Sequence, residues 1–314
     1  MTDLYTFGES LALFMTVDTD SVLTANNYAF SAAGTEANVA VCAHQLGLDV
    51  FFQTKLGPDQ LGDAVKDKFT EVGLKTNHFL RCDNYTGALV RNHGGTQPFV
   101  NTYLRRSSAG STFSPADLDE AVLAKSKWLH VTGISVAISE SSKEAVIRSI
   151  EIARKNNVGI SFDLNFRKKL WTKEKAREVM TTLCEHVDVC IGNEEDADLC
   201  LGFKAANTDV TKGELNLDGF KDVFKQMKEK FGFKFIASSL RESHSASDNG
   251  WSALVYDGTD FYHTKQYEVR IVDRVGSGDS FASGLIYGLV TGMPMADAAE
   301  FGVAASALKH TIPG

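Results

Sequence analysis

Hydrophobic residues along this chain follow two alternating periodicities. Short apolar runs, typical of buried strands, are separated by longer segments in which apolar positions recur every three or four residues, as in amphipathic helices. From about residue 128 to 239 the two kinds of segment alternate without interruption. This order is typical of parallel strands that are joined by crossover helices. We therefore predict an α/β fold with a doubly wound, mostly parallel sheet and helices on both of its faces.

The pattern places the elements of this main sheet as follows. The predicted strands are Leu4–Phe7, Val50–Thr54, Trp128–Thr132, Gly159–Asp163, Val187–Gly192 and Phe235–Ser238, followed by a hairpin over Ser252–Tyr256 and Asp260–Lys265. The predicted helices are Glu36–Leu46, Leu61–Glu71, Ser141–Asn156, Lys173–Glu185, Glu194–Leu201, Asp218–Phe231, 279–291 and 295–309. The polar segment Leu240–Gly250 is predicted to be a loop.

Four further strand-like segments have no helices between them. They are residues 11–16, 28–32, 86–92 and 98–105, the last two joined by a turn at His93-Gly94-Gly95-Thr96. They fit a small separate sheet that is inserted at about 9–32 and 85–107 into a single domain over 1–314. Such a sheet would cover the carboxyl ends of the central strands, where ligands bind in open α/β sheets, so we predict that it is a lid.

Composition narrows the class of protein and its partners. The chain has 314 residues, of which 43% are hydrophobic and 23% charged, as expected for a globular protein with a large core. A formal net charge of −8 argues against nucleic acid or an anionic membrane as the main partner. Its five cysteines, an odd number without zinc-site spacing or a preceding signal peptide, favour reduced thiols and a cytoplasmic location.

A glycine-rich turn at residues 276–279 carries the strongest chemical signal. Gly276, Ser277 and Gly278 precede a small-residue helical segment, so their backbone N–H groups would converge on a point that favours anions. Asp279 follows directly and would repel a phosphate if it were only structural. It makes sense as a base that deprotonates a hydroxyl beside a held phosphoryl group. The alternative, an ordinary helix start with an acid that favours the helix dipole, is equally open from the turn alone.

Two other polar clusters are candidate ligand sites near the predicted lid. Gly34 and Asn38 would contact the hydroxyls of a small ligand, or they mark a helix start that is capped by Thr35. Tyr103 and Arg105 share one face of a strand and would suit a polar ligand with a carboxylate or phosphate. A solvated edge strand is an equally open alternative for this pair.

Polar residues also follow two strands of the predicted main sheet. Asp163, Asn165 and Arg167 align just past a buried strand, and Asn165 and Arg167 would hold a phosphate or a substrate carboxylate. Asn193-Glu194-Glu195-Asp196 follows the next strand. Its acids either stabilise a helix dipole or contact Mg²⁺ through water.

Together these motifs resemble the ribokinase-like (PfkB) carbohydrate kinase family. The family's G-A-G-D signature is matched by Gly276-Ser277-Gly278-Asp279, and its Asn-Val-Ala motif by residues 34–40. Its N-x-x-E motif is approximated by residues 193–196, where Asp196 replaces the usual Glu and Glu195 would share its role. Within the family, the segments 34–38, 103–105 and 163–167 are most similar to those of 2-keto-3-deoxygluconate kinases.

The resemblance implies ATP-dependent phosphorylation of the 6-hydroxyl of 2-keto-3-deoxygluconate. Asp279 would be the base, and the N–H groups of Gly276, Ser277 and Gly278 the anion hole. The implied substrate-binding residues are Gly34, Thr35, Glu36, Asn38, Tyr103, Arg105 and Arg167. The implied ATP-binding residues are Asn165, Asn193, Ser238 and Arg241, with Mg²⁺ held indirectly, through water, by Asp196 and Glu195. A monovalent-cation site near Asp273 stays open from the sequence.

Other functions within this fold remain open from the sequence. They are a kinase for a neutral sugar, of the fructokinase or ribokinase type, and a sugar-binding sensor without catalysis. A sugar acid of the galactonate series is as compatible as one of the gluconate series. Exposed edges of the lid sheet favour a homo-oligomer. Related kinases often place a substrate-contacting acid just after the position of Gly314, which favours a natural chain that continues further.

Overall fold

The computed structural model describes residues 1–92, 100–204, 216–245 and 247–313, and a nine-stranded main sheet lies at its centre. Six strands run parallel in the order β4 (Val50–Gln53), β1 (Leu4–Phe7), β9 (Trp128–Thr132), β10 (Gly159–Asp163), β11 (Val189–Gly192) and β12 (Phe235–Ser243). Antiparallel strands extend it at one edge: β13 (Asp248–Tyr256), β14 (Phe261–His263) and β15 (Tyr267–Arg270). The predicted α/β class with a mostly parallel main sheet is confirmed.

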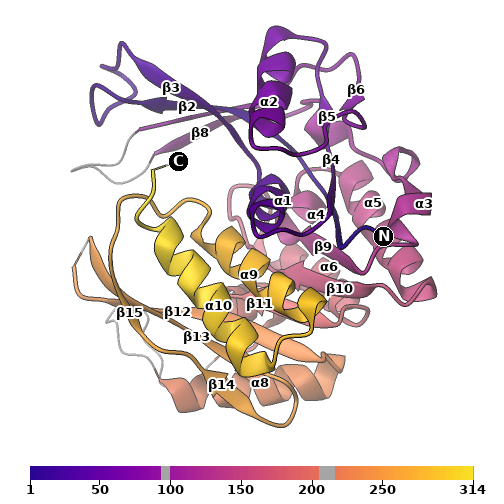
Figure 1. The fold of residues 1–314 in the computed structure, drawn as a ribbon, viewed down its shortest axis with the longest axis vertical. Coiled ribbons are helices and arrows are strands. Elements are labelled where there is room, and N and C mark those ends of the chain that lie inside the picture. The colour runs from indigo at the N-terminus through magenta and orange to yellow at the C-terminus, as the bar shows by residue number, and fades with distance from the viewer. Residues whose placement is uncertain (93–99, 205–215, 246, 314) are drawn as a thin grey trace.

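Helices cover both faces of the main sheet (Figure 1). One face is covered by α1 (Thr35–Gln45), α2 (Gln60–Glu71), α9 (Ser277–Thr291) and α10 (Met295–Lys309), and the other by α5 (Glu140–Lys155), α6 (Lys173–Cys184) and α8 (Leu217–Phe231). Short helices are α3 (Glu120–Leu123), α4 (Gly133–Ala137) and α7 (Glu194–Asp196). Alternate side chains enter the two cores, as where Val189 and Cys190 face opposite sides. Within the described ranges, no helix combines the length and apolar character needed to cross a membrane.

A small sheet of four strands stands apart from the main sheet (Figure 1). Its order is β3 (Tyr28–Ala33), β2 (Leu11–Thr16), β7 (Ala88–Arg91) and β8 (Asn101–Leu104). These strands lie within the four predicted segments, except that β3 extends one residue further, while the predicted turn at His93–Thr96 lies outside the described residues. A separate pair, β5 (Lys55–Leu56) and β6 (Leu80–Arg81), was not predicted because each strand is too short to show a pattern.

The four connections between the main body and the small sheet converge on Glu9. Glu9 itself lies in the first connection, and the other three contain Gly34, Gly87 and Gly110. There is no room for a side chain at Gly34, which packs on the Glu9 backbone, or at Gly110, which packs on the Glu9 side chain. Ser108, in the last connection, donates a hydrogen bond from Oγ to Glu9 Oε1 over 2.7 Å. The chain therefore crosses between the main body and the small sheet around a single buried carboxylate.

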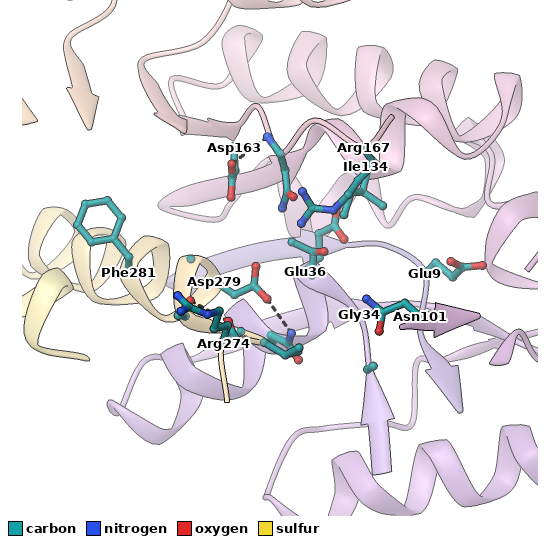
Figure 2. Close-up of a pocket in the computed structure, with 18 of the residues that line it drawn as sticks. Glu9, Gly34, Glu36, Asn101, Ile134, Asp163, Arg167, Arg274, Asp279 and Phe281 are labelled. Atoms are coloured by element: carbon teal, nitrogen blue, oxygen red, sulfur yellow. Dashed lines mark hydrogen bonds between the residues drawn. The ribbon is translucent and has the colours of Figure 1, made fainter. Parts of the chain in front are cut away.

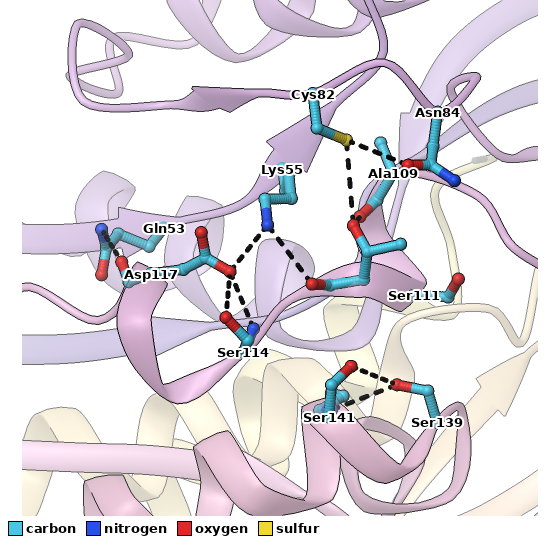
Figure 3. A network of polar contacts seen from close by, with 12 residues as sticks. Gln53, Lys55, Cys82, Asn84, Ala109, Ser111, Ser114, Asp117, Ser139 and Ser141 are labelled. Atoms are coloured by element: carbon cyan, nitrogen blue, oxygen red, sulfur yellow. Dashed lines mark hydrogen bonds and ion pairs between the residues drawn. The ribbon is translucent and has the colours of Figure 1, made fainter.

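A polar network holds the chain in place directly after this last connection (Figure 3). Lys55 Nζ lies 2.7 Å from Asp117 Oδ2 and also donates to the Thr112 carbonyl oxygen over 3.3 Å. Ser114 donates to the same carboxylate from both its N–H and its hydroxyl, over 2.8 Å each. These bonds fasten two 3₁₀ turns, Gly110–Thr112 and Pro115–Asp117, to β5.

Two predicted elements were wrong in detail. Most of the segment Leu240–Gly250 is strand rather than loop, because β12 extends to Ser243 and β13 begins at Asp248, and Leu240 pairs with Ser252. Along β12, Leu240 is fully buried, but the buried Ser238 before it is polar and so are Arg241, Glu242 and Ser243 after it, so no apolar–polar alternation shows in the sequence. The predicted helix over 194–201 is α7 followed by a π-helical turn, Ala197–Leu201.

Candidate active site

A pocket of about 460 Å³ lies where the carboxyl ends of the parallel strands meet the small sheet (Figure 2). Its size and its position are typical of ligand sites in open α/β folds. It brings together most of the predicted site residues: Gly34, Thr35, Glu36, Asn38, Tyr103, Arg105, Asn165, Arg167, Asn193, Asp196, Gly276, Ser277, Gly278 and Asp279. Glu195, Ser238 and Arg241 lie outside its lining, and on β12 the residue that faces the pocket is Ser239.

The glycine turn forms the N-terminus of α9. Gly276 has φ 80°, a left-handed conformation that favours glycine, and the helix begins at Ser277. The Ser277 N–H donates to the Arg274 carbonyl oxygen over 3.3 Å, so this group is engaged within the turn. The N–H groups of Gly278 and Asp279 lie in the first helical turn, which has no preceding helical carbonyl to accept them. We therefore expect these two groups to be the principal anion-binding donors.

Asp279 lies at the floor of the pocket, next to this turn. Its side chain is mostly buried and accepts a hydrogen bond from Asn38 Nδ2 over 2.7 Å, marked by the dashed line in Figure 2. Burial raises the pKa of Asp279 to about 6, against the opposing effects of the Asn38 hydrogen bond and the charges of Arg167 and Lys309. A carboxyl with a pKa near the working pH is well suited to accept a proton from a hydroxyl.

Glu36 is a second buried acid, close to Asp279. It is 1% exposed, and its Oε1 accepts hydrogen bonds from Thr132 Oγ1 over 2.8 Å and from Ser135 Oγ over 2.6 Å. Burial raises the pKa of Glu36 to about 7, although the two hydroxyls favour its ionised form. The sequence singled out Glu36 as a substrate-binding residue; its depth and its two hydroxyl partners also make it a structural support of the pocket.

Replacing Glu36 by glutamine should stabilise the protein at high pH. A raised pKa in the folded state means that the folded protein loses stability as the pH rises from about 4.5 through 7, on the order of 3 kcal/mol in total. Glutamine keeps the hydrogen-bond acceptor for Thr132 and Ser135 but carries no charge. Thermal unfolding measures this effect at pH 5 and pH 8. The unfolding temperature of the variant, relative to that of the wild type, should be higher at pH 8 than at pH 5.

Glu71→Gln is a matched control for this prediction, because Glu71 is an exposed glutamate at the end of α2. It should shift the unfolding temperature little at either pH. A difference between Glu36→Gln and the wild type that does not change with pH would contradict the assignment of a raised pKa to Glu36.

Arg105 reaches the pocket from the end of β8 but already has a partner. Its Nη2 lies 2.5 Å from Glu9 Oε2, with the two side chains 15% and 3% exposed. Burial raises the pKa of Glu9, and the Arg105 charge opposes that rise. The Arg105 Nε atom is buried and has no hydrogen-bond partner within the described part of the chain. One side of the guanidinium is thus held in place by Glu9, while the partly exposed side chain lines the pocket.

Sequence reasoning missed Glu9 and Arg274, which also line the pocket. A signal existed for each: Glu9 is a charged residue between two apolar strands, and Arg274 directly precedes the glycine turn. Burial and the nearby charge of Arg241 lower the pKa of Arg274. Arg241, although outside the lining, is therefore close enough to add to a positive potential that favours a polyanionic ligand.

Two further acids lie at the ends of β10 and β11. Burial raises the pKa of Asp163 well above its usual range, and the charges of Asp196 and Asp279 raise it further. Asp196 accepts hydrogen bonds from the N–H groups of Asn193, over 3.2 Å, and Phe166, over 3.1 Å, so both of its oxygens are engaged. Within the residues that the structure describes, no group of three His, Cys, Asp or Glu could hold a metal ion directly.

Comparisons with known proteins agree over the whole chain. Residues 1–314 match the family described as pfkB family carbohydrate kinase. The crystal structure of 2-dehydro-3-deoxygluconokinase from Thermotoga maritima is similar with a TM-score of 0.93 and 36% identity, covering 100% of this chain and 95% of that one. The 2-dehydro-3-deoxygalactonokinase of Haloferax volcanii is 28% identical, covering 99% of this chain and 92% of its own length. The 2-dehydro-3-deoxygluconokinase of Bacillus subtilis is 29% identical, and the match covers 99% of this chain and 90% of that protein.

Proposed function

Because the chain belongs to the PfkB family of carbohydrate kinases, we propose that it transfers a phosphoryl group from ATP to the 6-hydroxyl of a 2-keto-3-deoxy sugar acid. The first candidate is 2-keto-3-deoxygluconate, which is the same compound as 2-dehydro-3-deoxygluconate. One observation supports this most: two arginines, Arg105 and Arg167, line the same pocket as Asp279 and the glycine turn. An acid and an anion-binding turn suit phosphoryl transfer, and the arginines suit a substrate carboxylate.

In the proposed mechanism, Asp279 accepts the proton of the 6-hydroxyl as the oxygen attacks the γ-phosphorus. The Asn38 amide orients the Asp279 carboxylate through their 2.7 Å hydrogen bond. The N–H groups of Gly278 and Asp279, with the charge of Arg274, would stabilise the negative charge on the phosphoryl oxygens. ATP would extend from this turn towards Asn165, Asn193 and Ser239 at the ends of the central strands.

Magnesium fits this site as an ion that is held through water. The raised pKa of Asp163, caused by burial and by neighbouring acids, indicates that a cation would relieve their repulsion. Asp196, with both oxygens already engaged, and Glu195, outside the pocket lining, would contact the ion only through its water shell. When bound, Mg²⁺ would neutralise charge on the ATP phosphates.

A kinase for a neutral sugar is the second candidate function. The ion pair between Arg105 and Glu9 favours it, because that arginine already has a carboxylate partner. The relatives support an acid substrate but differ in its stereochemistry, since one is named for the galactonate and others for the gluconate compound.

The role of the small sheet as a lid and the assembly of a homo-oligomer stay predictions. Exposed apolar residues on the small sheet, among them Tyr28 and Leu104, are consistent with a homo-oligomer.

A substrate panel tests the proposed function directly. We expect ATP-dependent ADP release with 2-keto-3-deoxygluconate or its galactonate epimer, at a kcat/KM at least about tenfold above that with fructose or ribose. A preference for a neutral sugar would establish the second candidate. Thermal stabilisation by a sugar without ADP release, in the presence of ATP and Mg²⁺, would instead show a sensor that has lost turnover.

A further inference from the structure

Arg91, the last residue of β7, is charged and yet is among the largest fully buried side chains of the protein. Its Nη2 atom lies 2.7 Å from Oδ2 of Asp273, and the two side chains are 1% and 3% exposed. The pair joins the small sheet to the segment that leads into the glycine turn of α9. Burying two charges costs free energy of solvation, and a hydrophobic pair would often be at least as stable, so the pair calls for a functional reason.

Asp273 determines the shape of the anion-binding turn. Its second carboxylate oxygen, Oδ1, accepts a hydrogen bond from the Val275 N–H over 3.0 Å. Its own N–H donates to the His310 carbonyl oxygen over 3.1 Å, which ties the segment to the end of α10. Gly276 follows in its left-handed conformation. Any shift of the Asp273 carboxylate would therefore move the turn that carries the N–H donors.

A monovalent cation near Asp273, which the sequence left open, does not fit this environment. A cation bound to this carboxylate would lie beside the Arg91 guanidinium, which is 2.7 Å from Asp273 Oδ2, so two positive charges would be buried next to each other. Lys309 adds positive charge nearby: its pKa is lowered by burial and by Arg91, while Asp273 and Asp279 oppose that shift. The charge that a bound cation would supply is already present in the chain.

We propose that Arg91 takes the place of a monovalent cation at this turn, and that its guanidinium holds Asp273 so that the anion-binding N–H groups stay in position. Arg91 is a positioning residue, because it acts on the transferred phosphoryl group only through Asp273 and the turn. This inference rests on the proposed kinase function. Arg105 directly follows β8, the strand that pairs with β7, so one small sheet contacts the sugar side of the pocket and also supports its phosphate side.

The first experiment uses the wild-type protein and needs no variant. ADP release is measured with K⁺ or NH₄⁺ and then with tetramethylammonium at the same ionic strength. We expect kcat to change by less than about twofold, because the guanidinium is always present. A loss of about tenfold or more without K⁺ and NH₄⁺ would overturn the proposal.

The second experiment removes the guanidinium and offers it back. Arg91→Ala should lower kcat on the order of a hundredfold, as expected when reacting groups are displaced, with little change in the KM for the sugar acid. Low millimolar guanidinium or K⁺ should restore part of the loss. Arg106→Ala, at an exposed arginine outside the pocket lining, should have wild-type kcat and gain nothing from either ion. An Arg91→Ala enzyme with wild-type kcat, or one that neither ion restores, would contradict the proposal.

Two further measurements keep the test independent of folding and of substrate identity. Arg91→Met/Asp273→Asn removes both buried charges, so it should fold and should not respond to either ion. Thermal unfolding of the proteins without substrate should show K⁺ stabilising Arg91→Ala but not the wild type. Because unfolding does not depend on turnover, failure to phosphorylate any sugar acid would refute the proposed function and leave this readout intact. Stabilisation of the wild type by K⁺ would refute the inference alone.

Discussion

Asp279→Asn should lower kcat by roughly 10²–10⁴-fold, the usual contribution of a positioned general base, while the protein stays folded. Asparagine has nearly the same shape, and its carbonyl oxygen can accept the hydrogen bond from Asn38 that the carboxylate now accepts over 2.7 Å. It cannot take the proton of the substrate hydroxyl. ADP release at saturating ATP measures the loss, and thermal unfolding confirms the fold.

The pH profile gives this prediction a second, independent readout. Asp279 acts as a base only when it is ionised, and burial raises its pKa to about 6, so kcat/KM of the wild type should rise as the pH increases through 6. The residual activity of Asp279→Asn should lack that step. Near wild-type turnover in the variant would rule out Asp279 as the base, whatever its position in the pocket.

Asp279→Asn should also be at least as stable as the wild type above pH 6. The raised pKa means that the folded wild type loses stability as the pH rises through about 6, by an amount on the order of 1–3 kcal/mol. The neutral amide avoids this cost. A variant that is inactive and more stable would be the expected signature of a functional site that carries unfavourable burial.

Arg105→Ala should raise the KM for 2-keto-3-deoxygluconate by roughly 30- to 5,000-fold, corresponding to about 2–5 kcal/mol for one partner of a buried charge pair. The KM for a neutral sugar should change little. Initial rates with both kinds of substrate give the comparison. A KM for the sugar acid within about twofold of the wild type would place carboxylate recognition elsewhere, with Arg167 the next candidate.

The partner of Arg105 makes a second variant necessary. Arg105→Ala leaves the Glu9 carboxylate buried without its ion pair, which typically costs about 3–5 kcal/mol of stability. The double variant Arg105→Ala/Glu9→Gln removes both charges and should recover much of that stability without recovering affinity for the sugar acid. Arg106→Ala, one residue further along and exposed, should leave both KM values unchanged.

The main sheet could be predicted because its strands are buried on both sides. Runs such as Trp128–Thr132 and Gly159–Asp163 stand out from their polar surroundings, and the structure has them with the predicted bounds. Strands β12 and β13 were predicted only in part, as Phe235–Ser238 and Ser252–Tyr256, because the half of each strand beyond these residues carries few apolar side chains. Hydrophobic periodicity shows burial, so it fails where a strand continues into solvent.

The candidate site could be predicted residue by residue but not pair by pair. Asp279 and Asn38 were each singled out, yet the hydrogen bond between them joins positions 241 residues apart. The partners of Arg91 and Arg105 were not predicted at all. A local motif shows which side chains are able to bind an anion, whereas the identity of a buried counter-ion depends on how distant segments pack.

The attachment of the small sheet around Glu9 has a consequence for how substrate preference can evolve. Two of the residues that would read the sugar acid, Tyr103 and Arg105, belong to the small sheet and its last connection, whereas Asp279 and the glycine turn belong to the main body. Because every connection passes one point, mutations in the small sheet can accumulate without altering the strand order behind the catalytic turn. New substrates can thus be selected on an inherited phosphoryl-transfer apparatus, provided that Arg91 is kept.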